Sequence, residues 1–410
     1  MTQDAASVFT GLKVLDIATF VAAPAAATIL SDLGADVVKV EPPVGDPWRG
    51  QFTRPGMPRS RDESFDHLWN LAARNKRGIA LDLKSAGGQD VLRRLVTQAD
   101  VLITNFPLAV RERLGLSYES LAELNPRLIY ASLTGYGEVG PDKNLPGFDA
   151  TAWWSRSGLM GLIGPGPDAP PSRSLTGMGD HLTSVALFGA IATGLYRREL
   201  TGRGGVVQTS LLASGAWANA NLLQAALNGA VFEERTDRHN APNPLHNHYL
   251  CAGGSWISLA LNIANASVEW RRLLETLEAA DELAHIDIRH FRDLGRHNVE
   301  IIRAFDGIFE RRSAADWIAR LRAARFAVEL VPRMEEVASD PQLRATDCVI
   351  PTSQPDRMPL TVNSPIRIAG TSRVVPRPAP ALGQHSREIL SEAGYSADEI
   401  ENLFGAQAVR

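Results

Sequence analysis

The chain of 410 residues is too long for one average core, so two or three domains are expected. Apolar residues make up 44% of the sequence and charged residues 21%, which is ordinary for a globular protein. The net charge of -4, without a long basic run, argues against a nucleic-acid-binding protein.

The two cysteines, Cys251 and Cys348, form no C-x-x-C pair, so neither a disulfide scaffold nor a cysteine zinc site is expected. A reducing cytoplasm fits this pattern, and the N-terminus shows no apolar secretory signal. The longest apolar stretch, near Val185–Tyr196, is well short of the roughly 20 residues that span a bilayer. We therefore expect a cytoplasmic protein with no membrane partner.

The first part of the chain alternates strand and helix patterns. Leu12–Ile17 predicts a strand, an Ala-rich helix follows over about Ala23–Leu33, and Asp36–Val40 predicts a second strand. Gly34 ends the helix, as glycine often does just past a helix C-terminus. This βαβ arrangement predicts a parallel sheet.

Later segments extend the same pattern and then change character. We predict strands at Val101–Ile103, Leu128–Ser132 and Val206–Ser210, and helices at Asp90–Gln98, Asp180–Glu199 and Leu211–Leu227. After about Val231 the sequence predicts one strand pair and amphipathic helices such as Val268–Ala280 and Ala314–Ala324. The expected domains are residues 1–230 as the first part of a large domain, 231–330 as a small domain, and 331–410 returning to the large one.

Several common chemistries find no motif in this sequence. The turn Ala18–Pro24 after the first strand contains no glycine, although dinucleotide binding needs G-x-G-x-x-G there. Neither a G-x-S-x-G elbow nor a P-loop occurs. His246 and His248 lack an H-E-x-x-H pattern or a carboxylate cluster, so no metal site is expected.

Gly177-Met178-Gly179-Asp180 precedes the long apolar helix. Alone, Asp180 is most simply an N-cap that accepts hydrogen bonds from the first free N–H groups. The same helix end would stabilise a carboxylate anion, the form in which an aspartate acts as a nucleophile. The neighbouring glycines would let a substrate approach closely.

Seven motifs lie in order over nearly the whole chain: Gly11–Asp16, Leu33–Glu41, Asn75–Asp82, Asp100–Phe106, Leu124–Ile129, Thr201–Gly204 and Leu382–Ser386. Together they resemble the family III CoA-transferases, which include formyl-CoA transferase, the carnitine CoA-transferase and the α-methylacyl-CoA racemases. The resemblance implies a large Rossmann-like α/β domain formed by both chain ends, a small central α+β domain and an interlocked homodimer. Threaded rings break the usual rule against threading, so the dimer is implied by the resemblance alone.

The resemblance also implies roles for individual residues. Asp180 matches the aspartate that forms acyl-anhydride and aspartyl-CoA intermediates. The implied CoA-binding residues are Val21 and Ala22 in the turn near the catalytic centre, Lys76, Asn105, Phe106 and Arg113 around the adenine and phosphates, and Tyr136 as a further CoA contact. Coenzyme A enters as the acyl-CoA substrate, and no permanent cofactor or metal is implied.

The chain departs from the family pattern at two positions near the expected CoA site. Transferases often carry glutamine where Val21 stands, so an oxyanion contact is missing. Pro42 replaces an arginine that contacts phosphate, for which Arg49 or Arg74 could substitute.

Racemases need a base on each face of the substrate, which their pattern supplies with a histidine and a glutamate. The histidine is Phe148 here, and Leu261 or Asn262 stands where the glutamate would fall, so transfer of CoA is favoured over racemisation. A non-catalytic acyl-CoA-binding homologue is the other alternative. For the substrates, we expect a succinyl-CoA donor and a small carboxylic or dicarboxylic acid acceptor. Trp153 and Trp154, with Arg49, either line the acyl pocket or belong to the core.

Overall fold

The computed structural model describes residues 6–58, 62–261 and 266–410. Within them the chain divides into two compact units, each with its own hydrophobic core. The larger unit contains the chain up to Met160, Arg173–Gly229 and Gln342–Arg410. The smaller unit contains Gly161–Ser172 and Ala230–Pro341. Short helices α6 (Leu159–Leu162) and α14 (Pro341–Ala345) lie where the chain passes from one unit to the other.

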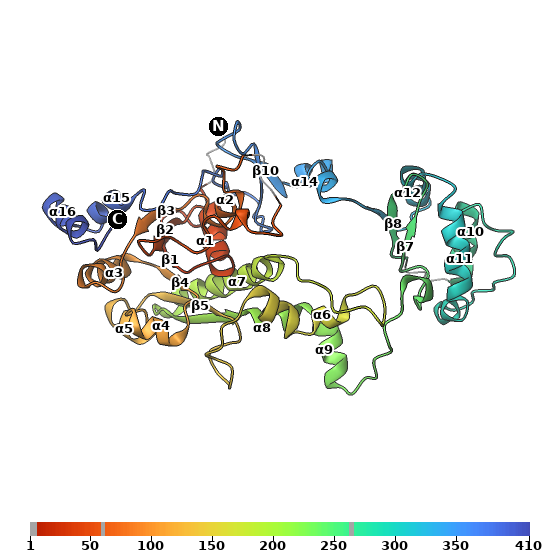
Figure 1. Cartoon of the computed structure of the whole chain (residues 1–410), viewed down its shortest axis with the longest axis horizontal. Helices are drawn as coiled ribbons and strands as arrows, with labels where there is room; N and C mark the ends of the chain where they lie inside the picture. Colours follow the sequence, from red (N-terminus) through yellow and green to blue (C-terminus); the bar gives the residue numbers. More distant parts are fainter. Residues whose placement is uncertain (1–5, 59–61, 262–265) are drawn as a thin grey trace. The chain divides into compact units, whose positions relative to one another are not determined.

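A six-stranded parallel sheet forms the centre of the larger unit (Figure 1). Its order is β3-β2-β1-β4-β5-β6, with β1 at Lys13–Ile17, β2 at Asp36–Glu41, β3 at Arg77–Ala80, β4 at Val101–Thr104, β5 at Ile129–Thr134 and β6 at Gly205–Ser210. The direction in which strands are added reverses between β1 and β4. Ligands of open α/β sheets bind at the carboxyl ends of the strands beside such a reversal. The expected α/β fold with a parallel sheet is confirmed.

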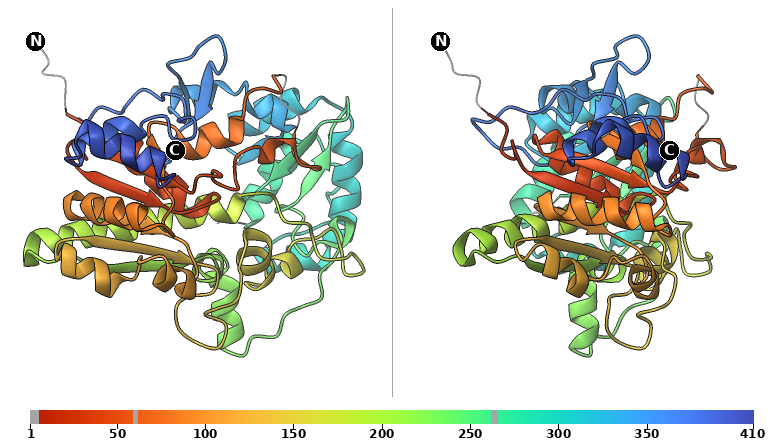
Figure 2. Two further views of the ribbon diagram at one scale, coloured as in Figure 1. Left: turned by 60° about the vertical axis from the view of Figure 1, so that its left-hand side comes forward. Right: turned by 90° about the vertical axis from the view of Figure 1, so that its left-hand side faces the viewer.

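Helices cover both faces of this sheet, as the two views of Figure 2 show. One face packs against α1 (Ala22–Asp32) and α7 (Met178–Thr201), and the other against α3 (Ala86–Gln98), α5 (Tyr118–Leu124), α15 (Ser386–Glu392) and α16 (Ala397–Gly405). Alternate strand residues serve the two faces: Val14 and Val37 join the α1 side, whereas Leu15 and Val38 join the α3 side. Every residue of α1 is buried, because alanines let this helix lie close to both the sheet and α7.

The remaining elements of the larger unit are mostly short. They are η1 (Gln51–Thr53), α2 (His67–Ala73), α4 (Leu108–Arg113), η2 (Asp149–Ser155), α8 (Leu211–Ala218), α9 (Ala220–Leu227), β10 (Val349–Pro351) and β11 (Leu360–Val362). The single helix expected over Leu211–Leu227 is therefore two helices, divided at Asn219. The C-terminal residues return to β3, where the Arg410 N–H donates to the Ala80 carbonyl at 3.0 Å.

The smaller unit contains a three-stranded antiparallel sheet of order β7-β8-β9. Its elements are η3 (Arg238–Asn240), β7 (His248–Leu250), β8 (Trp256–Leu259), α10 (Ala266–Thr276), η4 (Phe291–Arg296), α11 (Asn298–Phe309), α12 (Ala314–Ala323), β9 (Val328–Val331) and α13 (Met334–Val337). The third strand adds to the pair expected from the sequence. Aromatic rings dominate the core, with Tyr249 stacked on Phe309 at 5.0 Å between centroids.

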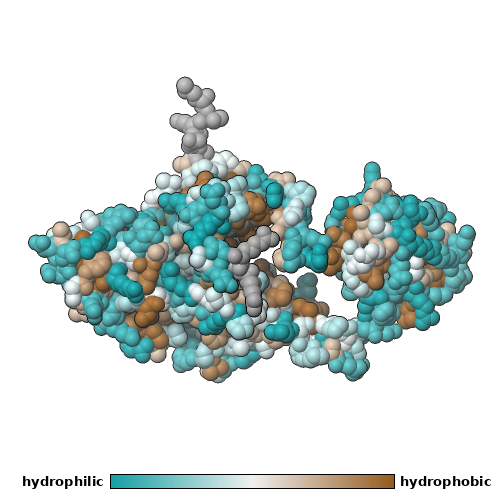
Figure 3. All heavy atoms as spheres, turned by 45° about the horizontal axis from the view of Figure 1, so that its top comes forward, coloured by the Kyte–Doolittle hydropathy of each residue, from teal (hydrophilic) through white to brown (hydrophobic). Residues whose placement is uncertain are grey.

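The surface carries mixed hydrophilic and hydrophobic side chains, and hydrophilic ones prevail on the face drawn in Figure 3. Among the helices formed by the described residues, none combines the length and the apolar character that crossing a bilayer requires.

Candidate active site

The turn after β1 lies at the reversal of strand order and is fixed from several sides. The Asn105 side chain, just after β4, accepts from the Thr19 N–H at 2.9 Å and donates to the Thr19 carbonyl at 2.7 Å. Phe20 adopts a left-handed φ of 62°, and its N–H donates to Asp46 at 3.1 Å. A non-glycine residue in this conformation is strained, so the backbone is held here rather than merely permitted.

A cluster of buried charged side chains also holds the turn after β1. Lys39 forms ion pairs with Asp46 at 2.9 Å and Asp16 at 3.6 Å, and donates to the Ala18 carbonyl. These side chains are almost wholly inaccessible to solvent. Buried charges of this kind are retained only where they are paired and hydrogen-bonded.

Lys76 belongs to this cluster, and its side chain is wholly buried there. It precedes β3, and its ammonium donates to Asp16 at 2.8 Å and to the carbonyls of Pro24 at 2.7 Å and Ala72 at 2.8 Å. An ammonium has three N–H donors, and all three are used. Burial lowers the pKa of Lys76 to about 8, against the opposing effect of Asp16. This geometry leaves no donor for a phosphate.

The other residues expected to bind CoA fall into two groups. Val21 and Ala22 are buried at the start of α1, so only their backbone can face a ligand. Phe106 and Tyr136 are half-buried after β4 and β5, at the carboxyl edge with Asn105.

Arg113 is exposed at the end of α4. It lies in a hollow of about 690 Å³ whose lining also includes Lys84, Gln89 and Glu112. The hollow therefore presents two exposed cations.

The two arginines considered as substitutes for the phosphate-binding arginine that Pro42 replaces already form ion pairs within the protein. Arg49 binds Glu41 through two hydrogen bonds of 2.7 Å and lies over the Trp69 ring. Arg74 is buried and binds Asp32 at 3.0 and 2.7 Å. Both guanidinium groups are therefore already paired with a carboxylate.

Asp180 is not the N-cap that its sequence position suggests. Helix α7 begins at Met178, and Gly177 occupies the cap position with a φ of 75°. Asp180 therefore lies inside the first turn, half-buried, and its carboxylate receives no hydrogen bond from any residue that the structure describes.

Asp149, the first residue of the π-helical turn η2, performs the capping instead. Its two carboxylate oxygens accept from the N–H groups of Gly177 at 2.8 Å and Gly179 at 3.1 Å. Gly179 is required for packing: a Cβ there would lie 2.3 Å from both Asp149 Oδ1 and the Trp153 ring. The expectation that Gly179 makes room for a substrate is thus replaced by a contact within the protein.

Both carboxyl groups at this helix end are weak acids. Burial, together with the negative charge of Asp149, raises the pKa of Asp180 to about 7. Burial raises the pKa of Asp149 to about 6, opposed by its two backbone hydrogen bonds. Two like charges in one half-buried place resist simultaneous ionisation.

Trp153 and Trp154 belong to the hydrophobic core, which is the second of the two roles considered for them. They are 2% and 3% exposed, with ring centroids 5.2 Å apart. They form no open aromatic wall with Arg49.

Comparisons with known proteins agree with this geometry. The family model described as CoA-transferase family III matches residues 9–386. The chain belongs to CoA-transferase family III. It is 30% identical over 402 residues to the (R)-2-hydroxy-4-methylpentanoate CoA-transferase of Clostridioides difficile, covering 98% of this chain and 99% of that protein. It is 31% identical over 404 residues to the cinnamoyl-CoA:phenyllactate CoA-transferase of Clostridium sporogenes, covering 97% and 96%.

Among solved structures, a CAIB/BAIF family protein from Brucella suis superimposes with a TM-score of 0.81. The two share 26% sequence identity, and the match covers 95% of this chain and 100% of the other. The resemblance inferred from the seven motifs is confirmed, and the chain is an enzyme of this transferase family.

The bases of a racemase have no counterpart among the described residues of this transferase at the two matching positions. Phe148 is 56% exposed beside Asp149, and its ring meets Phe20 edge to face at 6.0 Å. Leu261 is buried in the core of the smaller unit, and Asn262 lies outside the described residues. Neither a phenylalanine nor a leucine can move a proton.

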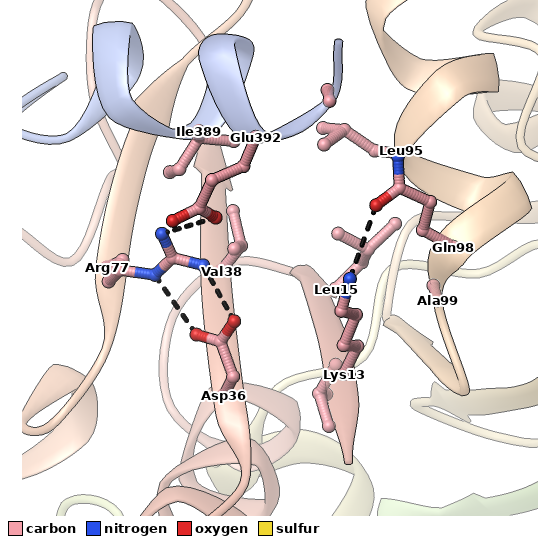
Figure 4. Close-up of a pocket in the computed structure, with 12 residues that line it drawn as sticks. Lys13, Leu15, Asp36, Val38, Arg77, Leu95, Gln98, Ala99, Ile389 and Glu392 are labelled. Carbon is pink, nitrogen blue, oxygen red and sulfur yellow. Dashed lines mark hydrogen bonds and ion pairs between the residues drawn. The ribbon is translucent and has the colours of Figure 1, made fainter. Parts of the chain in front are cut away.

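The amino edge of the sheet contains a separate small cavity of about 50 Å³ (Figure 4). Arg77 dominates it, bound to Asp36 at 2.6 Å and to Glu388 and Glu392 at 2.8 Å each. These pairs fasten α15 to the start of β3. The guanidinium group of Arg77 is fully paired, and the cavity lies at the edge of the sheet opposite to Asn105. This cavity therefore belongs to the packing of the larger unit and not to the transferase site.

Proposed function

We propose that this transferase moves coenzyme A from an acyl-CoA donor to a small carboxylic acid through covalent intermediates on Asp180. The supporting observation is the state of the Asp180 carboxylate. It lies half-buried on the first turn of α7, and Asp149 has taken the capping role that would otherwise occupy it. A carboxylate without a structural task is available as a nucleophile.

The proposed reaction begins with attack of an Asp180 oxygen on the donor carbonyl carbon. The C–S bond breaks, giving an aspartyl acyl anhydride and CoA thiolate. The thiolate then attacks the aspartyl carbonyl and the donor acid leaves as its carboxylate, so that Asp180 carries CoA as a thioester. The acceptor carboxylate attacks that thioester to form a second anhydride and release the thiolate. Attack of the thiolate on the acceptor carbonyl yields the new acyl-CoA and restores Asp180.

We propose that CoA lies along the carboxyl edge of the sheet. Asn105, Phe106 and Tyr136 follow β4 and β5 at this edge, where ligands of such sheets bind. Arg113, with Lys84, offers exposed positive charge in a hollow of about 690 Å³ for the phosphates. In this proposal Lys76 acts indirectly, by supporting the turn that contains Val21.

For the donor, succinyl-CoA is the first compound to test. For the acceptor, the surroundings of Asp149 favour a monocarboxylic acid with an apolar or aromatic side chain over a dicarboxylic acid. Phe20 and Phe148 provide an apolar edge, whereas Arg49 and Arg74 are already paired. The names of the two relatives, for 2-hydroxy-4-methylpentanoate and phenyllactate, point the same way, whereas a succinyl-CoA:glutarate CoA-transferase of Mus musculus, 30% identical to this chain, is named for a dicarboxylic acid.

Hydroxylamine trapping tests the covalent mechanism. The enzyme is incubated with succinyl-CoA, acetyl-CoA or cinnamoyl-CoA and hydroxylamine, and its peptides are examined by mass spectrometry. We expect a hydroxamate on Asp180 with at least one donor, and none in Asp180→Asn. Turnover with a donor, but without a hydroxamate on Asp180, would refute the mechanism. Binding of acyl-CoA with no turnover and no hydroxamate would indicate a non-catalytic homologue.

We also propose that the chain forms a homodimer in the cytoplasm. Helices α8 and α9 expose large apolar side chains, including Trp217 at 83% and Leu227 at 74%. Apolar side chains gathered in this way usually mark an interface. The cysteines Cys251 and Cys348 are both free, which suits a reducing compartment. Light scattering after size-exclusion chromatography would give the mass of the assembly, and a monomer at micromolar concentration would exclude a stable dimer.

A further inference from the structure

The amino end of α7 carries a second carboxylate that the proposed reaction does not use. Asp149 lies 31 positions before Asp180 in the sequence, yet it is bonded to the same helix turn. We infer that Asp149 is a positioning residue for the nucleophile: it fastens the first turn of α7 and takes the helix-end hydrogen bonds that Asp180 would otherwise receive. This inference rests on the proposed role of Asp180.

The fastening is specific in its geometry. One carboxylate oxygen of Asp149 binds Gly177, where the chain turns into the helix with a φ of 75°, and the other binds Gly179. Gly179 is also pressed against Trp153, which is buried in the same π-helical turn as Asp149. The backbone next to Asp180 therefore cannot shift without breaking two hydrogen bonds and the contact with Trp153.

The same arrangement adds to burial in raising the pKa of Asp180. A free helix N-terminus would favour its ionised form, but here a neighbouring anion uses those N–H groups. The other ionisable neighbours contribute little positive charge. Burial and Arg74 lower the pKa of His181, which favours the neutral imidazole, and Arg74 is itself paired with Asp32. Among the described residues, Asp149 is the one charged group found to act on Asp180.

The consequence is that both carboxyl groups lose their protons well above the usual pH range of aspartate, with a pKa of about 6 for Asp149 and about 7 for Asp180. Because the two groups interact, their titration steps belong to the pair. A carboxylate of higher pKa is a more basic nucleophile once ionised, as Brønsted behaviour requires. Asp149 thereby keeps Asp180 reactive near neutral pH, while preventing it from becoming an inert, strongly stabilised anion.

Substrate-free titration of the carboxyl groups tests this inference without relying on turnover. The full-length enzyme is labelled with ¹³C at the aspartate carboxyl carbons, and the spectrum is followed from pH 4 to 9. The Asp180 signal is identified by its absence in Asp180→Asn. We expect Asp149→Asn to lower the midpoint of the Asp180 titration by about one pH unit or more, as removal of a nearby like charge should. The matched control is Asp142→Asn. Asp142 precedes η2 and pairs with Arg156 on the surface, so its replacement should not affect the titration of Asp180.

A kinetic measurement provides the second readout. With whichever acyl-CoA and acid support exchange, the acid limb of the kcat/KM profile should move to lower pH in Asp149→Asn by the same amount. A general loss of packing would lower kcat/KM at every pH without moving this limb.

Two results would overturn the inference: an unchanged Asp180 titration in folded Asp149→Asn, or no carboxyl group titrating between pH 5 and 8 in the wild type. If Asp149→Asn does not fold, the titration of Asp180→Asn still tests whether the two carboxyl groups titrate as a pair, because this variant leaves the hydrogen bonds of Asp149 intact. It should remove the upper of two titration steps and keep the lower. A shifted titration with no hydroxamate on Asp180 would instead reject the proposed function and keep the pairing of the two carboxyl groups.

Discussion

The two edges of the six-stranded sheet in this transferase are built on different principles. At the amino edge, Arg77 meets three partly exposed carboxylates and joins α15 to β3. At the carboxyl edge, charges are buried, Phe20 is held in a left-handed conformation, and two carboxyl groups raise each other's cost of ionisation. Strained or electrostatically unfavourable groups persist where the surrounding structure over-determines them, and they gather at functional sites. The comparison suggests that the amino edge serves stability and the carboxyl edge serves the reaction.

The largest expected effect comes from removing the nucleophile. Asp180→Ala should lower kcat by at least about 1000-fold, since no covalent intermediate can form. Binding of CoA, measured by calorimetry, should change by less than about threefold, because Asp180 is not among the groups proposed to hold CoA. Near-normal turnover in this variant would show that Asp180 is not the nucleophile.

Lys76 tests whether the buried cluster is structural. Lys76→Met leaves Asp16 with one of its two cations, and breaking a buried pair typically costs about 3–5 kcal/mol of the free energy of unfolding. Urea denaturation would measure this loss. The double variant Asp16→Asn with Lys76→Met should recover part of it, because the unpaired charge is then removed. If Lys76→Met were fully stable but bound CoA tenfold more weakly, the ammonium would be a phosphate ligand after all.

Asn105 and Asn125 offer a matched pair at opposite edges. Asn105 bonds both backbone groups of Thr19, whereas the Asn125 side chain bonds the carbonyls of Val96 and Ala99 before β5. Replacement with alanine removes two hydrogen bonds at Asn105 and three at Asn125, where the side chain also accepts from the Arg127 N–H, and either variant should lose about 1–3 kcal/mol of stability. Only Asn105→Ala should also lower kcat/KM, by about 10- to 100-fold, because a misplaced turn disturbs alignment of the reacting groups. Equal kinetic effects of the two variants would remove the distinction between the edges.

Part of this architecture is predictable from local sequence patterns. The strand at β1, the Ala-rich helix α1 and the strand at β2 follow from short apolar runs bounded by Gly34 and the prolines after Glu41. Asp180 can likewise be selected by its motif. The reversal of strand order and the return of the C-terminal residues to β3 depend on tertiary contacts that periodicity does not encode.

The features of the site that the sequence does not predict have the same origin. Lysine is seldom buried, so the sequence favours an accessible Lys76, and only the fold brings this side chain to Asp16. The capping role of Asp149 is hidden in the sequence because it acts across a long loop rather than from the position before the helix. Its place after Phe148 in the G-F-D segment is the available signal, although the family pattern draws attention there only to the missing histidine.

The smallest effect belongs to the amino edge. Arg77→Met removes three ion pairs of a side chain that is 20% exposed, and each such pair contributes at most about 1 kcal/mol. We expect a loss of about 1–2 kcal/mol in urea denaturation, with the loss reduced at high salt because partly exposed charges are screened. The kcat/KM at 25 °C should stay within about twofold of the wild type, since the substitution lies at the edge away from Asp180. If activity fell while stability held, Arg77 would be coupled to the site through β3, and the two edges would no longer be separable.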